Sequence, residues 1–219
     1  MAETDQHDRT ETPTQKRQED ARRRGQVPRS RDLNAAAVTL AGGFGLYNLG
    51  AMLGDGMLHM MHAALGAASL RAALAAAPLL GLILSAAVLA PLAIGGWNFS
   101  ATALVPQWQR LDPIAGMQRL FSLQGFIELL KSLARFSVVA LIAVLVLRHQ
   151  YSQFALLSTE PLRAAIMHSL SLAGTALIAL GGGLAAIAAV DVPLALWQHN
   201  RSLRMSRDEI REESRDSEG

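Results

Sequence analysis

Few side chains in this chain have the types and spacing that chemistry requires. Asp55, His59 and His62 follow one another at intervals of four and three residues, so a helix would gather them on one side as a metal site does. A zinc-type site needs three or four protein ligands, and no further ligand is evident beside these three. We therefore interpret them as surface residues, and we expect neither a metal ion nor another cofactor.

Asp191 is the second candidate, because it follows the long uncharged segment Ala164–Val190. An ionisable residue inside a membrane span is a functional candidate by default. Near the end of such a span, capping of the helix or pairing with Arg201 explains it equally well. His168 is a lone polar residue, which we interpret as a hydrogen-bonded histidine at the membrane interface. The sequence has no cysteine, no GxSxG, HExxH or phosphate-binding glycine loop, and no nucleophile paired with a base, so we expect no enzyme.

The surrounding composition is that of a membrane protein. Apolar residues make up 51% of the 219 residues and charged residues only 17%, against about 25% in soluble domains. About 20 mostly apolar residues are needed to cross a bilayer. We predict an all-α membrane protein with four transmembrane helices that form two hairpins. The predicted spans cover residues 33–54, 74–96, 127–147 and 166–190.

The distribution of basic residues predicts the orientation of these spans. If both termini are cytoplasmic, 17 of the 20 Lys and Arg residues lie on the cytoplasmic side, as the positive-inside rule favours. The chain then divides into an arm (1–32), a transmembrane domain (33–194) with a long cytoplasmic loop (97–125), and a charged segment (195–219). The basic residues flank the spans without interleaved aromatic residues, which argues against binding of nucleic acid.

The third span is unusual because its uncharged part, Phe136–Leu147, has only 12 residues, or about 18 Å of helix. The helix must begin earlier, where Glu128, Lys131 and Arg135 share one face. Either this charged face contacts protein or water inside the membrane, or the helix emerges early and the face is simply solvated. Glycines in the first and last spans predict close helix packing, within the chain or around other subunits, and a bend near residues 181–183.

The polar segments predict short helices. Residues 14–24 suit a charged helix with Thr12 as its cap, Pro13 in its first turn and Gly25 at its end, and Ser30 or Asp32 suits the cap of the first span. A disordered arm on anionic lipid is the alternative. Residues 199–219 suit a charged helical stalk without a core. The loop 97–125 is long and apolar, so it lies either on its own membrane or across a neighbouring membrane protein.

Three stretches resemble a known family. TETPTQKR and ARRRGQVPRSRDL (residues 10–33), GGWNFS with LDPIAGMQRLFS (95–122), and LRMSRDEIREESRDSEG (203–219) are similar to the FlhB family of type III export switch proteins, in its flagellar branch. The resemblance implies an inner-membrane, multi-pass component that wraps an export gate of FliP, FliQ and FliR type proteins. FlhA type protein, membrane lipid and exported flagellar proteins are its further implied partners.

The resemblance also implies which residues act. The implied gate contacts are Trp97, Phe99, Pro106, Leu111, Pro113, Gly116, Leu120 and Phe121, and the implied arm residues are Pro13, Lys16, Arg17, Gly25, Pro28 and Arg29. The family's self-cleaving Asn-Pro-Thr-His motif does not occur in this sequence. We therefore expect a segment that leads toward an absent C-terminal domain. A small-solute transporter or channel is the competing interpretation, for which Asp191 would be the site.

Overall fold

The computed structural model describes residues 11–62, 67–97 and 123–218. Four long helices dominate it: α3 (Arg31–His62), α4 (Ala67–Gly95), α6 (Leu123–Leu156) and α7 (Leu162–Ser202). Two short helices, α2 (Gln15–Arg23) and α8 (Arg207–Glu218), flank them, and a single 3₁₀ turn, η3 (Leu157–Thr159), joins α6 to α7. All four long helices have the length and hydropathy to cross a membrane. The all-α membrane fold predicted from the sequence is confirmed.

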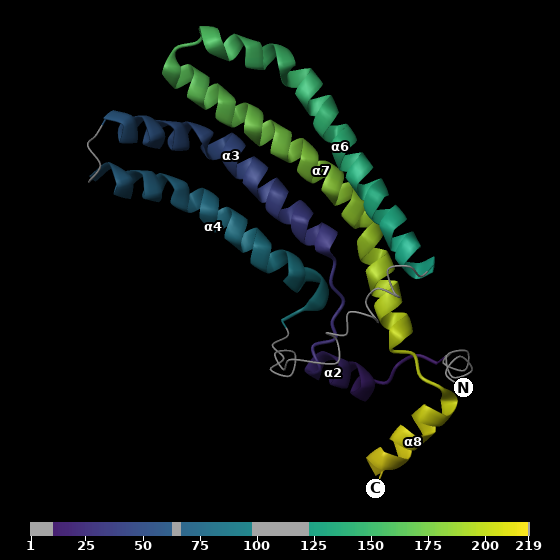
Figure 1. The fold of residues 1–219 in the computed structure, drawn as a ribbon. Coiled ribbons are helices and arrows are strands. Elements are labelled where there is room, and N and C mark those ends of the chain that lie inside the picture. Colours follow the sequence, from purple (N-terminus) through teal and green to yellow (C-terminus); the bar gives the residue numbers. More distant parts are fainter. Residues whose placement is uncertain (1–10, 63–66, 98–122, 219) are drawn as a thin grey trace, which may run out of the picture.

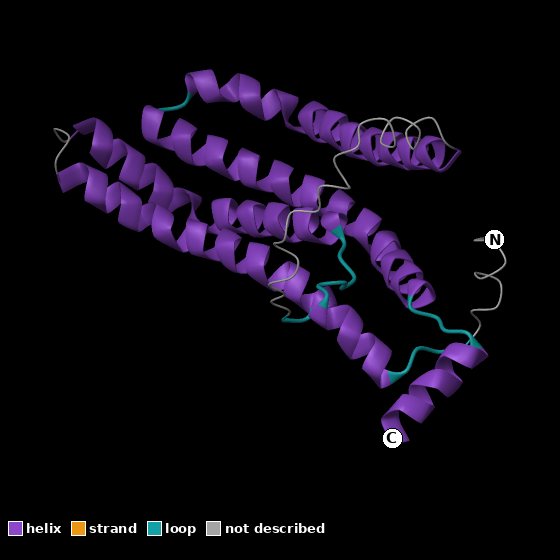
Figure 2. Cartoon of the chain, turned by 60° about the horizontal axis from the view of Figure 1, so that its bottom comes forward, coloured by secondary structure: helices purple, strands orange, loops and turns teal. Residues whose placement is uncertain are grey.

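Helix α3 lies at the centre of the arrangement. It packs against α4 on one side and, more extensively, against α7 on the other, while α6 packs mainly on α7. Consecutive long helices thus lie beside each other as the pairs α3–α4 and α6–α7 (Figure 1), and the rotated view shows the same order (Figure 2). The α3–α7 contact therefore joins the two hairpins.

The helices extend beyond the predicted spans. Helix α7 has 41 residues, which is about 60 Å of helix, twice the roughly 30 Å of a bilayer core. Helix α6 begins at Leu123, so it does start before the short uncharged stretch, as predicted. Helix α7 is continuous through Gly181, Gly182 and Gly183, and the bend predicted there stays a prediction.

Small residues account for the close approach of α3 and α7. A Cβ atom added at Gly174 would lie 2.7 Å from the backbone nitrogen of Tyr47, and one added at Gly43 would lie 2.7 Å from that of Ile178. Real Cβ atoms do not come so near, so both positions require glycine. These two glycines serve packing within the chain. Gly182, in contrast, faces open space.

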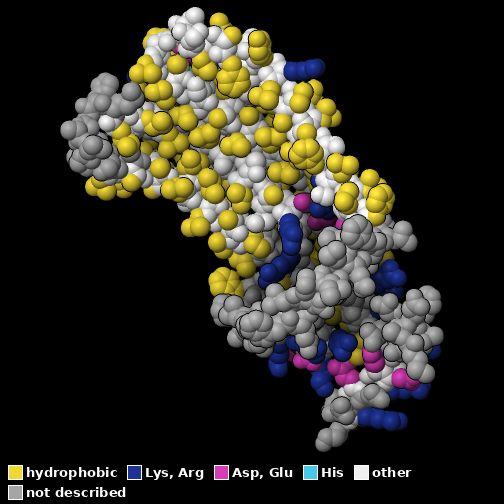
Figure 3. Space-filling view, viewed as in Figure 1, with side chains coloured by type: hydrophobic (Ala, Val, Ile, Leu, Met, Phe, Trp, Pro, Cys, Tyr) yellow, Lys and Arg dark blue, Asp and Glu magenta, His cyan; other side chains and the backbone are white. Residues whose placement is uncertain are grey.

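The outer faces of α4 and α6 remain apolar and are not covered by other described residues of the chain. None of the most apolar stretch of α6 is buried, and little of that of α4. In Figure 3, hydrophobic side chains cover most of the visible surface of the long helices, and acidic and basic side chains gather at the end that carries α2 and α8. The molecule is therefore divided into an apolar body and one charged end.

Candidate functional site

The N-terminal arm, which contains α2, forms the first part of the charged end. Helix α2 begins where the Thr14 hydroxyl accepts a hydrogen bond from the Arg17 backbone nitrogen at 3.2 Å. The predicted cap, Thr12, is wrong, because it lies too far upstream to reach the unpaired amide groups of the first turn. Gly25 ends the helix as predicted: with φ +75°, it allows the backbone nitrogens of Gly25 and Gln26 to donate to Arg22 and Ala21.

The turn that leads into α3 is held between two other helices. A Cβ atom at Gly95, the last residue of α4, would lie 3.2 Å from the Pro28 carbonyl oxygen. The Ser30 hydroxyl accepts from the Leu33 backbone nitrogen at 3.2 Å and donates to Asp191 Oδ2 at 2.9 Å. Ser30 is thus the cap of α3, one of the two predicted residues. Its hydroxyl also connects the start of α3 to α7.

Arg135 of α6 completes what we call the charged junction, formed by Ser30, Asp32, Arg135 and Asp191. Its guanidinium group donates to Asp191 Oδ1 at 2.8 Å and lies 3.1 Å from Asp32 Oδ2. The contact with Asp32 is an ion pair without hydrogen-bond geometry, because Asp32 Oδ2 has no hydrogen-bond partner among the described residues. One arginine therefore ties α3, α6 and α7 together.

The pairing of Asp191 corrects the sequence interpretation. Arg201, the proposed partner, lies over the ring of Trp197 at 5.3 Å instead. Ten residues along one helix separate Arg201 from Asp191 by about 15 Å, so the two cannot meet. Arg135 reaches Asp191 because it comes from the facing helix. This contact also favours the first interpretation of the charged face of α6, since Arg135 turns toward protein.

The two carboxylates of the charged junction are largely shielded from solvent, which increases their need for the ion pairs with Arg135. The side chains of Asp32 and Asp191 are 16% and 20% exposed, and that of Arg135 is 42% exposed. Two carboxylates so little solvated need a cation beside them, because an isolated buried charge is costly. Asp32 also lies in the first turn of α3, where the positive end of the helix dipole favours a carboxylate.

A second set of contacts, the arm clasp, joins the arm to the far end of the chain. It consists of Glu11, Thr14, Met205, Arg207 and Glu213. The backbones of Glu11 and Met205 exchange two hydrogen bonds of 3.1 and 3.2 Å in an isolated β-bridge. The Arg207 side chain donates to Glu11 at 2.9 Å, and the Thr14 hydroxyl donates to Glu213 at 2.7 Å. Both ends of the described chain are thus held at one end of the bundle.

The arm clasp overturns the prediction of a helical stalk without a core. Helix α7 ends at Ser202, and Leu203 and Met205 in the break that follows are buried. Helix α8 then begins with a capping box, in which Ser206 and Glu209 each accept from the other's backbone nitrogen. The sequence Ser-Arg-Asp-Glu carried this signal, and sequence reasoning missed it.

The other predicted residues are placed as follows. Trp97 lies two residues after the end of α4 and is 86% exposed, whereas the remaining proposed gate contacts lie outside the described residues: Phe99, Pro106, Leu111, Pro113, Gly116, Leu120 and Phe121. Among the arm residues, Lys16 is exposed and Arg17 is half-buried, both in α2, and Arg29 is exposed beside Ser30.

Two polar contacts hold the opposite end of the bundle. Arg163 of α7 donates to both carboxylate oxygens of Asp55 at 2.9–3.2 Å, so Asp55 is an ion-pair partner. His168 Nδ1 lies 3.0 Å from Glu160 Oε1 and thus has the polar partner that was predicted for it. Among the described residues, no group of three His, Asp or Glu side chains could hold a metal ion.

Comparison with known proteins identifies the family of the chain. Residues 7–219 match the family described as the FlhB HrpN YscU SpaS family. The chain belongs to this family. The flagellar biosynthetic protein FlhB of Salmonella typhimurium is 33% identical over all of the chain, and that of Escherichia coli is 33% identical over 97% of it. The hypersensitivity response secretion protein HrcU of Ralstonia nicotianae is 30% identical over 97% of the chain. The chain spans 62% and 60% of the two FlhB proteins and 64% of HrcU.

Proposed function

We propose that this chain is a membrane subunit of the bacterial flagellar type III protein export apparatus, where it wraps the export gate and helps to control its opening. The observation that carries the proposal is the match of residues 7–219 to the family, together with the 33% identity to flagellar members. The family includes injectisome proteins, and the motif GQVPRSRD favours the flagellar branch.

The uncovered helix faces support contact with other membrane subunits. Helices α4 and α6 present long apolar faces that no other part of the described chain covers. We assign these faces, together with the loop from Trp97 to Phe121, to a gate core of FliP, FliQ and FliR type proteins. An FlhA type protein and the exported flagellar proteins are the further proposed partners, at the charged end.

The charged end supports an orientation in the inner membrane with both termini cytoplasmic. The arm clasp holds residue 11 beside residue 205, so both ends of the described chain lie on the same side of the bundle. Because most Lys and Arg residues fall on that side, the positive-inside rule places it in the cytoplasm. The domain boundaries at 32, 97–125 and 194 remain part of this proposal.

The charged junction gives this subunit a way to respond to its loop. The loop leaves α4 next to Pro28 and enters α6 twelve residues before Arg135. A displacement of either loop end would therefore act on the turn before α3 or on the helix that supplies Arg135. The transporter alternative loses its site, because Asp191 is already bound by Arg135 and Ser30.

The proposal is tested by complementation. A bacterium that lacks its own FlhB would receive the full-length gene of this protein, or the same gene with residues 98–122 replaced by a flexible linker of equal length. We expect the intact gene to restore motility and filament export, and the replaced loop to abolish both while the protein still inserts in the membrane. Motility with the replaced loop would contradict the role of the loop.

A further inference from the structure

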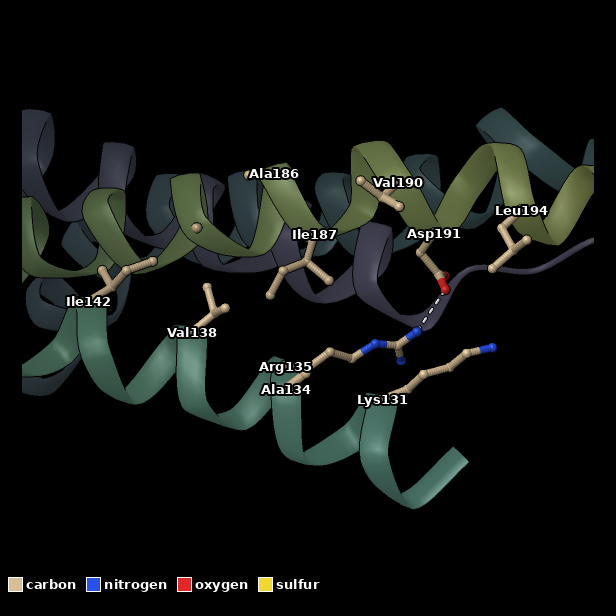
Figure 4. A pocket seen from close by; sticks show the side chains of 11 residues that line it. Lys131, Ala134, Arg135, Val138, Ile142, Ala186, Ile187, Val190, Asp191 and Leu194 are labelled. Carbon is tan, nitrogen blue, oxygen red and sulfur yellow. Dashed lines mark hydrogen bonds and ion pairs between the residues drawn. The ribbon is translucent and has the colours of Figure 1, made fainter. Parts of the chain in front are cut away.

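An apolar groove runs between α6 and α7 and ends at the charged junction. Its volume is about 490 Å³, and its walls are Ala134, Val138 and Ile142 of α6 and Ala186, Ile187 and Val190 of α7. Figure 4 shows Ile187 of α7 and Val138 and Ile142 of α6 pointing into the space between the two helices, with Lys131 and Arg135 at the same end as Asp191. The groove is thus apolar along its length and charged at one end.

The dimensions of the groove limit what can occupy it. It extends over eleven residue steps of each helix, from Lys131 to Ile142 and from Gly183 to Leu194, or about 17 Å. Divided by this length, the volume open to the centres of water-sized atoms gives a cross-section of about 30 Å², and adding one water diameter of about 2.8 Å makes the groove about 9 Å wide. A helix with its side chains is about 10–12 Å wide. A methylene chain, about 4 Å wide by the contact distance of carbon atoms, fits.

The charges at the mouth indicate the rest of the ligand. Arg135 is engaged by Asp191 and Asp32, whereas the Lys131 ammonium group has no partner among the described residues. Arg29 and Arg31, both exposed, flank Ser30, whose hydroxyl contacts Asp191. The Lys131 cation at the end of an apolar groove is complementary to a phosphate that carries an acyl chain. Basic pockets between transmembrane helices bind anionic headgroups in this way.

We propose that the α6–α7 groove binds one anionic phospholipid, with an acyl chain between Val138 and Ile187 and the phosphate on Lys131. The site lies in the leaflet at the junction end, which is the cytoplasmic leaflet in the orientation proposed above. The lipid fills the gap between α6 and α7 and places a negative charge beside Lys131, opposite the carboxylates of the junction. The hairpin α6–α7 would then depend on anionic lipid for its geometry.

Lipid retention by the purified full-length protein tests this proposal without any export partner, so its outcome is separate from that of the proposed function. The protein would be released from nanodiscs containing equal amounts of phosphatidylglycerol and phosphatidylcholine and examined by native mass spectrometry. We expect one phosphatidylglycerol retained per chain in preference to phosphatidylcholine. Lys131→Gln should weaken that preference about fivefold, the contribution of one basic residue near a lipid surface, and Lys131→Arg should keep it.

Two further variants separate the groove from general attraction to lipid. Arg148→Gln removes a cation from the same helix outside the groove and should leave retention unchanged, whereas Ala186→Trp should fill the groove and remove the bound lipid. Equal retention of the two lipids, or equal effects of Lys131→Gln and Arg148→Gln, would overturn the proposal. So would a membrane extract in which Ala186→Trp releases a bound protein subunit while the lipid stays.

Discussion

Replacing Arg135 with methionine tests the charged junction most sharply. The substitution keeps an unbranched apolar stem but leaves Asp32 and Asp191, both largely buried, without their cation. Breaking a buried ion pair costs about 3–5 kcal/mol, and breaking an exposed one costs about 0–1 kcal/mol. Because the Arg135 side chain is 42% exposed, we expect the free energy of unfolding to fall by about 2 kcal/mol, between these limits.

The measurement is reversible unfolding of the full-length protein in mixed micelles with increasing SDS, followed by circular dichroism. Arg148→Met is the matched control, because Arg148 lies on the same helix, is exposed and has no ion pair among those of the described residues. Adding Asp32→Asn and Asp191→Asn to Arg135→Met should recover more than half of the loss, since the uncompensated charges are then gone. Equal effects of Arg135→Met and Arg148→Met would refute the reasoning.

Four further substitutions test the rest of the bundle by the same unfolding measurement. Gly174→Val should separate α3 from α7 and lower the free energy of unfolding by more than about 2 kcal/mol, as overpacking does. Its control is Gly182→Ala, at a position that faces open space, which should be neutral or stabilising by up to about 1 kcal/mol. Similar losses of stability in both variants would contradict the packing described. Gln150→Leu removes hydrogen bonds to the Leu172 carbonyl and the Thr175 hydroxyl and should cost about 0.6–1.7 kcal/mol, the range for such bonds between membrane helices; no loss would show that they contribute nothing. Arg163→Met breaks the exposed ion pair with Asp55 and should cost under about 1 kcal/mol. A loss of stability as large as that of Arg135→Met would contradict the claim that the charged junction contributes more than this exposed ion pair.

The fold was predictable because lipid imposes simple rules. Uncharged runs long enough to cross a bilayer must be helices, since backbone groups in lipid need internal partners. Gly25 and Ser30 were predictable for a similar reason: a positive φ and an unpaired helix amide require particular residue types. Features that depend on neighbouring residues, such as helix ends, could therefore be predicted from the sequence.

The contacts within the site could not be predicted from the sequence, because they join residues that lie far apart in the chain. Asp191 was recognised as a candidate, but its partner Arg135 lies 56 residues away on another helix, and nothing in the local sequence distinguishes it from Arg201. The same holds for the bridge between Glu11 and Met205, which turns an apparent stalk into a packed contact. Periodicity identifies a helix face, but it does not identify what lies against that face.

Co-isolation of the gate core tests the central claim most directly. The full-length protein, tagged at its C-terminus, would be purified in mild detergent from the complemented bacterium, and its bound subunits identified by mass spectrometry. The account predicts that FliP, FliQ and FliR type proteins accompany the intact protein and are lost when residues 98–122 are replaced by a linker. Their absence from the intact protein, with the tagged chain stable in the membrane, would contradict the claim that this chain wraps the export gate.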